Sequence, residues 1–345
     1  MSNLTDLRDF SRQQLVDWVA SLGLPAFRAK QLLAWLHRPG IADFSQMTNL
    51  SKELRLQLQE LAQLSEPEVA AREVSADGTR KYGLTLADGA VIESVLIPDD
   101  ERLTLCVSSQ VGCAMDCSFC CTATMGFKRN LTPSEITGQL RVVQADLGAE
   151  NRIHNLVFMG MGEPLANLEN LLTSLDILCD DLAYGYSPKR ITISTCGLAP
   201  KLIELGRRAP AGLNLAISLH GASDAIREQL MPINKSYNIA DLLAACQAYP
   251  LQKRQRITFE YILLADVNDG VAQARELARL LRGIPCKINL LPCNEAPEIP
   301  YKRPGRQQVL AFQNILKKAG YTVLIRSSRG ADISAACGQL ASQHQ

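Results

Sequence analysis

Three cysteines stand close together about a third of the way along the chain. They are Cys113, Cys117 and Cys120, spaced C-x3-C-x2-C. Three thiolates this close can hold one metal centre, and soft sulfur ligands favour zinc or an iron–sulfur cluster. A structural zinc site needs four ligands. No second cysteine pair lies nearby to supply the fourth ligand. Cys121 directly follows Cys120, so its side chain would have to turn back to reach the same metal. Three ligands fit a [4Fe–4S] cluster with one iron left open, and we predict that these cysteines bind one.

The spacing of these cysteines, with Phe119 directly before the last one, resembles the radical S-adenosylmethionine (SAM) superfamily. In that superfamily the open iron binds the amino and carboxylate groups of SAM, which is cleaved reductively to a carbon radical. The protein's part in such chemistry is to hold and orient the cofactor. The resemblance implies two cofactors, the [4Fe–4S] cluster and SAM, and an external electron donor for the cluster.

Glycines and polar residues follow the ends of several strand-like segments. Glycines let the backbone approach a ligand, and Glu163 and Ser194 can bond the amino and ribose groups of SAM. We expect these residues to form a cofactor cradle. The segments at these strand ends are 160–164, 194–197, 218–220 and 292–294.

Strand-like and helix-like segments alternate from residue 102 onward. This alternation indicates βα units and a parallel sheet, either open or curled into a barrel. One helix is expected to open at Thr132, with Pro133 as its first residue and Glu135 completing a capping box. Active sites of such folds lie beyond the C-terminal ends of the strands. The expected strands are 102–108, 153–159, 190–195, 213–219, 256–264, 286–291 and 321–325.

The N-terminal part of the chain has a different pattern. Apolar residues such as Leu15, Val19 and Leu22 recur at helical spacing over the first 65 residues. Between 79 and 97, alternating segments flank Asp88-Gly89, which is a hairpin signal. We therefore predict three regions: a helical accessory domain over 1–75, a connecting β-hairpin over 76–101 and an α/β domain over 102–345.

Composition and charge narrow the class of protein. The 345 residues are 47% hydrophobic and 21% charged, as in soluble globular proteins. Acidic residues near the N-terminus exclude a signal peptide, and no apolar run approaches the roughly 18 residues of a membrane helix. Eleven cysteines in such a chain favour metal or redox chemistry over a disulfide scaffold. We expect a cytoplasmic monomer with no membrane association.

Charge is unevenly distributed along the chain. Residues 1–112 hold 11 Lys and Arg against 15 Asp and Glu, a net charge of −4, whereas residues 249–329 hold 14 against 6, a net charge of +8. The basic half, which includes Lys253, Arg254 and Arg256, suits a polyanion such as RNA. The same residues are also compatible with solvated helix faces.

Several longer runs resemble the RlmN/Cfr family of RNA adenine methyltransferases. Together they reach from the N-terminal helices to the C-terminal segment, so the resemblance covers nearly the whole chain. The runs are FRAKQL at 27–32, MTNLS at 47–51, CAMDCSFC at 113–120, GFKRNL at 126–131, GMGEPL at 160–165, SLH at 218–220 and RGADISAACGQL at 329–340.

The resemblance implies a fold and a set of roles. The α/β part should be a partial (β/α)6 barrel and the N-terminal helices an RNA-contacting domain. The three clustered cysteines fall on the family's cluster positions. Seven residues of the cradle fall where the family binds SAM: Gly162, Glu163, Ser194, Ser218, Leu219, His220 and Asn294. Cys337 falls where the family carries a methyl group, Cys106 on its partner cysteine and Glu93 on its proton acceptor.

The resemblance also implies a reaction that uses two SAM molecules per turnover. Cys337 takes a methyl group from one, and the other supplies a radical that turns this methyl into a carbon radical, which adds to adenine. Glu93 removes the ring proton, and Cys106 attacks the thioether, leaving a Cys106–Cys337 disulfide. Both thiols should be accessible, with lowered pKa values. The preferred target is C2 of an adenine in 23S ribosomal RNA, with transfer RNA as a further substrate.

Some alternatives remain open. Cys121 and Cys293 stand where the family pattern leads us to expect other residues, and a C8 methyltransferase of Cfr type shares the motifs. A glycyl-radical activase would share the cluster motif, and a zinc RNA-binding module would share the cysteines. Cys106 lies in an apolar strand, where an inert buried cysteine is common. We assign Cys179, Cys196, Cys246 and Cys286 to packing.

Overall fold

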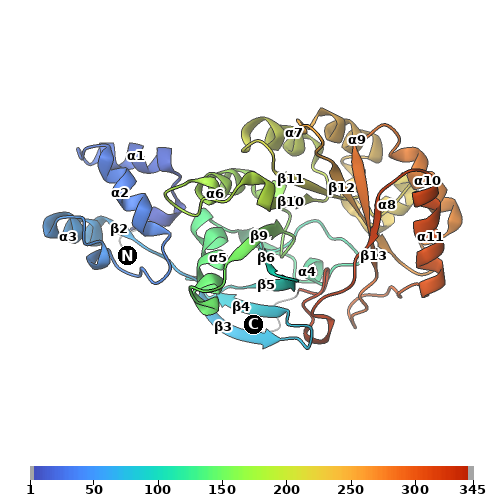
Figure 1. Ribbon diagram of the computed structural model, residues 1–345, viewed down its shortest axis with the longest axis horizontal. Coiled ribbons are helices and arrows are strands. Elements are labelled where there is room, and N and C mark those ends of the chain that lie inside the picture. Colours follow the sequence, from blue (N-terminus) through green and yellow to red (C-terminus); the bar gives the residue numbers. More distant parts are fainter. Residues whose placement is uncertain (1–3, 341–345) are drawn as a thin grey trace.

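The computed structural model describes residues 4–340. Its N-terminal part is a small helical unit with an apolar core of its own, at the left of Figure 1. Leu15, Leu32 and Leu58, one from each helix, are fully buried in that core. The elements are β1 (Thr5–Asp6), η1 (Leu7–Asp9), α1 (Arg12–Ser21), α2 (Phe27–Leu36), η2 (Phe44–Gln46), α3 (Lys52–Leu61) and β2 (Ala62–Gln63), with β1 and β2 paired in parallel.

Ion pairs of two buried arginines with one partly exposed carboxylate join this unit to the rest of the chain. Arg8 from η1 and Arg141 from helix α5 (Pro133–Leu147) are both buried, and both bind the Glu66 carboxylate. The Ser134 N–H at the start of α5 donates to Asp9 Oδ1 at 2.8 Å. Because the first turn of α5 donates this hydrogen bond to the accessory unit, the two parts have a defined contact.

One ten-stranded sheet forms the body of the molecule, in the order β14-β13-β12-β11-β10-β9-β6-β5-β4-β3. Seven of its strands run parallel, which confirms the predicted barrel-type α/β fold. All seven match expected strands. They are β6 (Arg102–Cys106), β9 (Ile153–Phe158), β10 (Ile191–Thr195), β11 (Asn214–Ser218), β12 (Ile257–Leu263), β13 (Cys286–Pro292) and β14 (Val323–Ile325).

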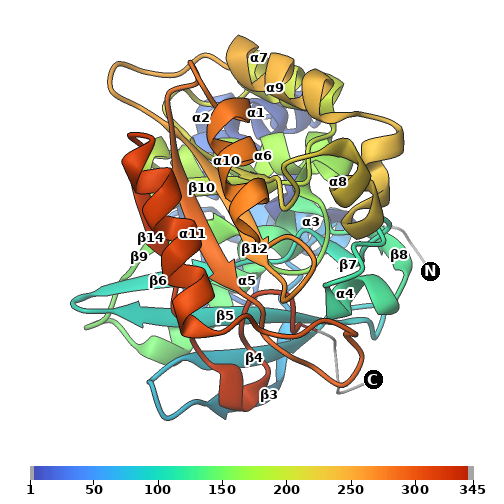
Figure 2. The ribbon, with the colours of Figure 1, turned by 90° about the vertical axis from the view of Figure 1, so that its right-hand side faces the viewer.

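Helices follow these strands and cover one face of the curved sheet (Figures 1 and 2). Helix α5 begins as predicted, with Thr132 as N-cap, Pro133 in its first turn and Glu135 completing the capping box. No helix among residues 4–340 is long and apolar enough to cross a membrane. The other helices and short turns are η3 (Pro164–Asn167), α6 (Leu168–Cys179), η4 (Pro188–Arg190), α7 (Ala199–Arg208), α8 (Asp224–Leu230), η5 (Pro232–Lys235), α9 (Ile239–Ala248), α10 (Val271–Leu280), α11 (Arg306–Lys318) and η6 (Ala331–Ile333).

The predicted hairpin is present, but it is more than a connector. Strands β4 (Arg80–Thr85) and β5 (Val91–Asp99) pair antiparallel, and β5 continues into the parallel part through β6. Residues 68–74, which we placed in the helical domain, form strand β3 (Glu68–Val74) on the far side of β4. Because β3 is an edge strand and mostly exposed, pairing rather than burial sets its conformation, and its sequence carries no apolar periodicity.

Candidate active site

The three predicted cluster ligands lie on one loop that is closed by a small hairpin. Strand β7 (Gln110–Gly112) enters the loop, and α4 (Cys121–Thr124) and β8 (Phe127–Asn130) leave it, with β7 and β8 paired antiparallel. The Cys113 N–H donates to the Gly126 carbonyl at 3.0 Å, and the Ser118 N–H donates to the Leu230 carbonyl, also at 3.0 Å. The loop is therefore held both at its base and against helix α8.

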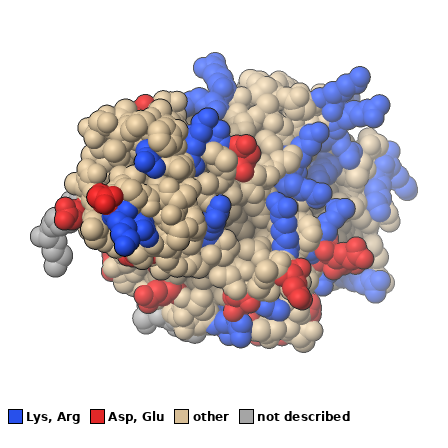
Figure 3. All heavy atoms as spheres, turned by 60° about the vertical axis from the view of Figure 1, so that its left-hand side comes forward, with Lys and Arg blue, Asp and Glu red and all other residues tan. Residues whose placement is uncertain are grey.

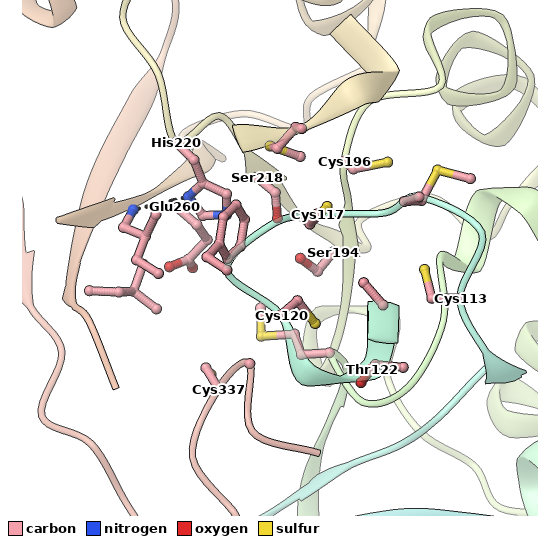
Figure 4. A pocket seen from close by; sticks show the side chains of 18 of the residues that line it. Cys113, Cys117, Cys120, Thr122, Ser194, Cys196, Ser218, His220, Glu260 and Cys337 are labelled. Atoms are coloured by element: carbon pink, nitrogen blue, oxygen red, sulfur yellow. Dashed lines mark hydrogen bonds between the residues drawn. The ribbon is translucent and has the colours of Figure 1, made fainter. Parts of the chain in front are cut away.

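The sulfur-bearing side chains of this loop surround one cavity (Figure 4). Burial raises the pKa of Cys113 to about 11 and also raises the pKa values of Cys117 and Cys120. A raised pKa means that forming the thiolate is costly in this environment. A coordinating metal offsets that cost, since it binds the thiolate form. Among residues 4–340 no three His, Cys, Asp or Glu side chains surround a single-ion site. A four-iron cluster offers each thiolate its own iron, so three half-buried thiols around one cavity fit the predicted cluster.

The same cavity is lined by six of the seven residues predicted to hold SAM. They lie after β9, at the ends of β10 and β11, and after β13, so the C-terminal strand ends do meet at one place, as expected. Leu219 is the exception, because its side chain is fully buried in the core. Gly162 has a φ of +96° and a Cβ there would lie 2.5 Å from Gln110 Cβ, so this turn requires glycine.

Glu163 organises two of these strand ends. Its buried carboxylate accepts the Leu165 N–H at 2.9 Å on Oε1 and the Cys196 N–H at 2.7 Å on Oε2. Burial raises its pKa, and these hydrogen bonds oppose the rise. A carboxylate offers about four acceptor positions, so Glu163 can close these turns and still accept a bond from a ligand amine.

His220 is a neutral histidine locked in place. Its Nδ1 accepts the Ile262 N–H at 2.9 Å, which leaves the proton on Nε2. Burial, with a smaller effect from the Arg227 charge, lowers its pKa to about 3. The ring packs edge-on against Phe119, with centroids 4.8 Å apart. His220 therefore ties β11 and β12 to the cluster loop.

Cys337 is exposed and lines the cavity beside the cluster loop. Three hydrogen bonds hold its neighbours. The Asn294 Nδ2 donates to the Cys337 carbonyl at 3.1 Å, the Cys121 N–H to the Gly338 carbonyl at 2.7 Å, and the Thr122 hydroxyl to the Leu340 carbonyl at 2.7 Å. The unexpected Cys121 thus contributes through its backbone, while its side chain is buried.

Cys106 ends strand β6 and is buried, and it lines an adjoining cavity that Cys120 and Cys337 also line. All eleven cysteines are free thiols. Burial, together with the charge of Cys337, raises the pKa of Cys106 to about 12, and Arg326 opposes this rise. The expectation of a lowered pKa is therefore wrong for Cys106, because desolvation in the strand outweighs the nearby cation.

The third predicted catalytic residue lies just behind the cavity wall. Glu93 is buried on β5, two residues before Val95, which does line the cavity. Burial raises the pKa of the Cys121 thiol on α4, and the negative charge of Glu93 contributes to that rise. The structure thus brings Glu93 near the cluster loop without placing it among the lining side chains.

Sequence reasoning missed several cavity residues. Arg326, directly after β14, lines both cavities, and its pKa is raised chiefly by the charge of Cys337. Glu260 of β12 lines the main cavity and accepts Asn289 Nδ2 at 2.9 Å. The sequence alone could have pointed to both residues, since Glu260 is the one acid in an apolar strand and Arg326 directly follows the last strand. Cys196, which we assigned to packing, lines the cavity as well.

Comparisons with known proteins agree with this geometry. Residues 5–64 match the model of the ribosomal RNA large subunit methyltransferase N-terminal domain, and residues 107–279 match the radical SAM superfamily. A protein of Desulfotalea psychrophila named dual-specificity RNA methyltransferase RlmN is 52% identical, over 97% of this chain and 94% of its own length. Its namesake in Syntrophus aciditrophicus is 49% identical, over 98% and 97%.

A solved structure extends the agreement to three dimensions. A radical SAM methyltransferase from Sphaerobacter thermophilus is 41% identical and superposes with a TM-score of 0.91, covering 98% of this chain and all of the other. The radical SAM match is contrary to the zinc-module alternative, and the match of residues 5–64 is contrary to a glycyl-radical activase. The chain belongs to the RlmN family of radical SAM RNA methyltransferases.

Proposed function

We propose that this chain methylates a ring carbon of adenine in RNA, preferably C2 in 23S ribosomal RNA, with transfer RNA as a further substrate. The relatives' name, dual-specificity RNA methyltransferase, supports an RNA substrate. One observation supports the mechanism above all others. Cys106 and Cys337, 231 positions apart in the sequence, line one cavity together with Cys120 of the cluster loop. Such an arrangement serves a reaction that uses both thiols next to the cluster.

The chain's own residues divide the work. Cys113, Cys117 and Cys120 would hold the cluster, and Leu219 would shape one of the turns around SAM from behind. SAM itself would be surrounded by Gly162, Glu163, Ser194, Ser218, His220 and Asn294. When bound, the cluster and two SAM molecules per turnover supply the methyl group and a carbon radical, using electrons from an external donor.

The two special cysteines act at different steps. Cys337, exposed at the cavity, accepts the methyl group and carries its carbon to the base, forming a covalent protein–RNA adduct. Glu93 accepts the proton that leaves the ring carbon. The adduct gives up one electron to the external redox partner. Cys106 then attacks the Cys337 sulfur, a Cys106–Cys337 disulfide forms as the carbon–sulfur bond breaks, and the released carbon takes up a proton to become the methyl group of the base. Arg326 beside both thiols stabilises negative charge on either of them.

RNA contacts are proposed at the cavity end of the sheet. Figure 3 shows Lys and Arg gathered over one side of the molecule. Lys253 and Arg254, however, precede the N-terminal end of β12, whereas the cavity is lined by Glu260 and Ile262, nearer the C-terminal end of that strand. Exposed cations nearer the cavity follow β13 and β14 and lie in β8: Lys302, Arg303, Arg329 and Lys128. We assign phosphate binding to this second set, on a monomer acting in the cytoplasm.

Mass spectrometry of nucleosides tests the proposal. RNA incubated with the reconstituted enzyme, SAM and a reductant should yield 2-methyladenosine. A Cys113→Ala variant, which lacks one cluster ligand, is the matched control and should yield none. Recovery of 8-methyladenosine alone would contradict the proposed position on the base, and recovery of no methyladenosine from ribosomal or transfer RNA would contradict the proposed substrate.

A further inference from the structure

A buried lysine connects the region behind the cavity wall with the protein surface. Lys81 on β4 has a side chain only 2% exposed, and its Nζ lies 2.9 Å from Glu73 Oε1 and 3.8 Å from Glu93 Oε1. The Glu93 side chain is 1% exposed, whereas the Glu73 side chain is 37% exposed. One ammonium group is therefore shared by a buried carboxylate and a carboxylate that reaches solvent.

Strand register places Lys81 on the sheet face that borders the cavity. Residues directly opposite each other in antiparallel strands point to the same face. Glu73 lies opposite Lys81, Lys81 opposite Val95, and Val95 opposite Cys106. Val95 and Cys106 line the cavity with Cys337, and Glu93 shares their face, two residues along β5. A single row of side chains thus runs from the reactive cysteine to the edge strand β3.

Packing alone does not require a charge at position 81. A buried ion pair is costly to desolvate, and apolar residues of similar volume often serve the fold as well or better. Within residues 4–340, Glu93 faces the Lys81 ammonium on β4 and the Cys121 thiol on α4, with Glu73 beyond the lysine on β3. Cys106 on β6 and Arg326 after β14 face the adjoining cavity. Within the described residues, 4–340, Lys81 is the cation whose ammonium lies within 4 Å of the Glu93 carboxylate.

We propose that Lys81 holds Glu93 as a carboxylate and carries the proton that Glu93 receives from the RNA base out to Glu73 and solvent. This inference rests on the proposed function, in which Glu93 is the proton acceptor. Lys81 donates one proton to Glu73 and takes up the proton from Glu93, so the ammonium is regenerated and Glu73 releases its proton to water. A movement of Nζ by about 1 Å exchanges its hydrogen-bond partner from Glu73 to Glu93.

The test separates proton removal from the earlier steps. Lys81→Met, Lys81→Arg and Glu73→Gln are compared with Lys201→Met, a control at an exposed lysine of α7. Single-turnover reactions are followed by 5′-deoxyadenosine formation, by covalent RNA–protein adduct on a denaturing gel, and by release of methylated RNA over the active pH range. Lys81→Met should cleave SAM and form adduct like the control but release methylated RNA about tenfold or more slowly.

The other variants sharpen the outcome. Lys81→Arg keeps the charge and should restore most of the release rate, and Glu73→Gln should shift the pH profile of release without changing adduct formation. Release by Lys81→Met at the rate of Lys201→Met would overturn the inference. Should Lys81→Met fail to fold, an unchanged pH profile of Glu73→Gln would overturn it instead. Absence of adduct even in a Cys106→Ala background would contradict the proposed function itself.

Discussion

Strand β6 and the segment 327–340 each deliver one cysteine to the same cavity, but they do so in opposite ways. Cys106 is fixed by a strand in the middle of the ten-stranded sheet and is buried. Cys337 lies on a segment with little regular structure, is exposed, and is positioned by hydrogen bonds from Asn294 and from α4. Under the proposed mechanism, the thiol that receives and carries the methyl group is the accessible one, whereas the thiol that acts last is shielded.

Both regions depend on the cluster loop between them, so the largest effect is expected there. Replacing Cys117 by Ala should reduce SAM cleavage by about 100-fold or more, since one of three ligands is lost. The fold should persist, because the ligand lies on a loop. The measurement is 5′-deoxyadenosine formation together with far-UV circular dichroism. Wild-type cleavage by this variant would show that the ligands are wrongly assigned.

The anchoring of Cys337 can be weakened without touching its sulfur. Thr122→Val removes the hydroxyl that donates to the Leu340 carbonyl and leaves that buried carbonyl without this donor, at a cost of about 1–3 kcal/mol. Turnover should fall about tenfold while iron content stays normal. Thr124→Val, whose hydroxyl bonds only within its own turn, is the control and should stay near wild type. Equal turnover of the two variants would mean that the anchor does not position Cys337.

The difference in burial predicts a difference in alkylation. The thiolate is the reactive form, and with its pKa raised to about 12 Cys106 is a thiol throughout the neutral range. Its thiolate fraction grows about tenfold per pH unit below that pKa. Iodoacetamide with mass-spectrometric mapping, on protein without its cluster, should label Cys337 first and Cys106 increasingly as pH rises. Preferential labelling of Cys106 at neutral pH would contradict this assignment.

The smallest effect is expected on RNA affinity, when basic residues at one end of the sheet are changed and compared with those at the other end. Changing Lys302, Arg303 and Arg329 to Gln should weaken RNA binding and reduce its salt slope by about 0.7–0.9 per lost phosphate contact. The matched triple change of Lys253, Arg254 and Arg256, at the opposite end, should have less effect. Filter binding at several salt concentrations decides this, and a larger effect of the second triple would move the RNA surface away from the cavity.

The sequence predicted the strands and helix starts whose formation depends on residues near one another in the chain. Alternating apolar segments located all seven parallel strands, and Thr132, Pro133 and Glu135 marked the start of α5 because a capping box is made within four residues. The cradle residues could be predicted to lie together because the C-terminal ends of parallel strands meet at the same edge of a sheet.

Features that depend on distant partners could not be predicted in this way. The β3 edge is set by pairing with β4, and the raised pKa of Cys106 comes from burial between strands. The shared ammonium of Lys81 needs the register of three strands at once. Motif resemblance named Cys106 and Glu93, but it did not give the environment that decides when each can act.

A denaturing gel of the Cys106→Ala variant tests the central claim most directly. Because the proposed mechanism uses Cys106 only after the adduct has formed, this variant should accumulate a slow-migrating, nuclease-sensitive band of protein joined to RNA. Cys337→Ala and the double variant should give neither band nor methylated RNA, since the proposal assigns to Cys337 the carbon that reaches the base. A buried cysteine with a packing role alone would instead cause a modest loss of stability. Free methylated RNA produced by the Cys106→Ala variant at ordinary rates, without a covalent band, would contradict the account.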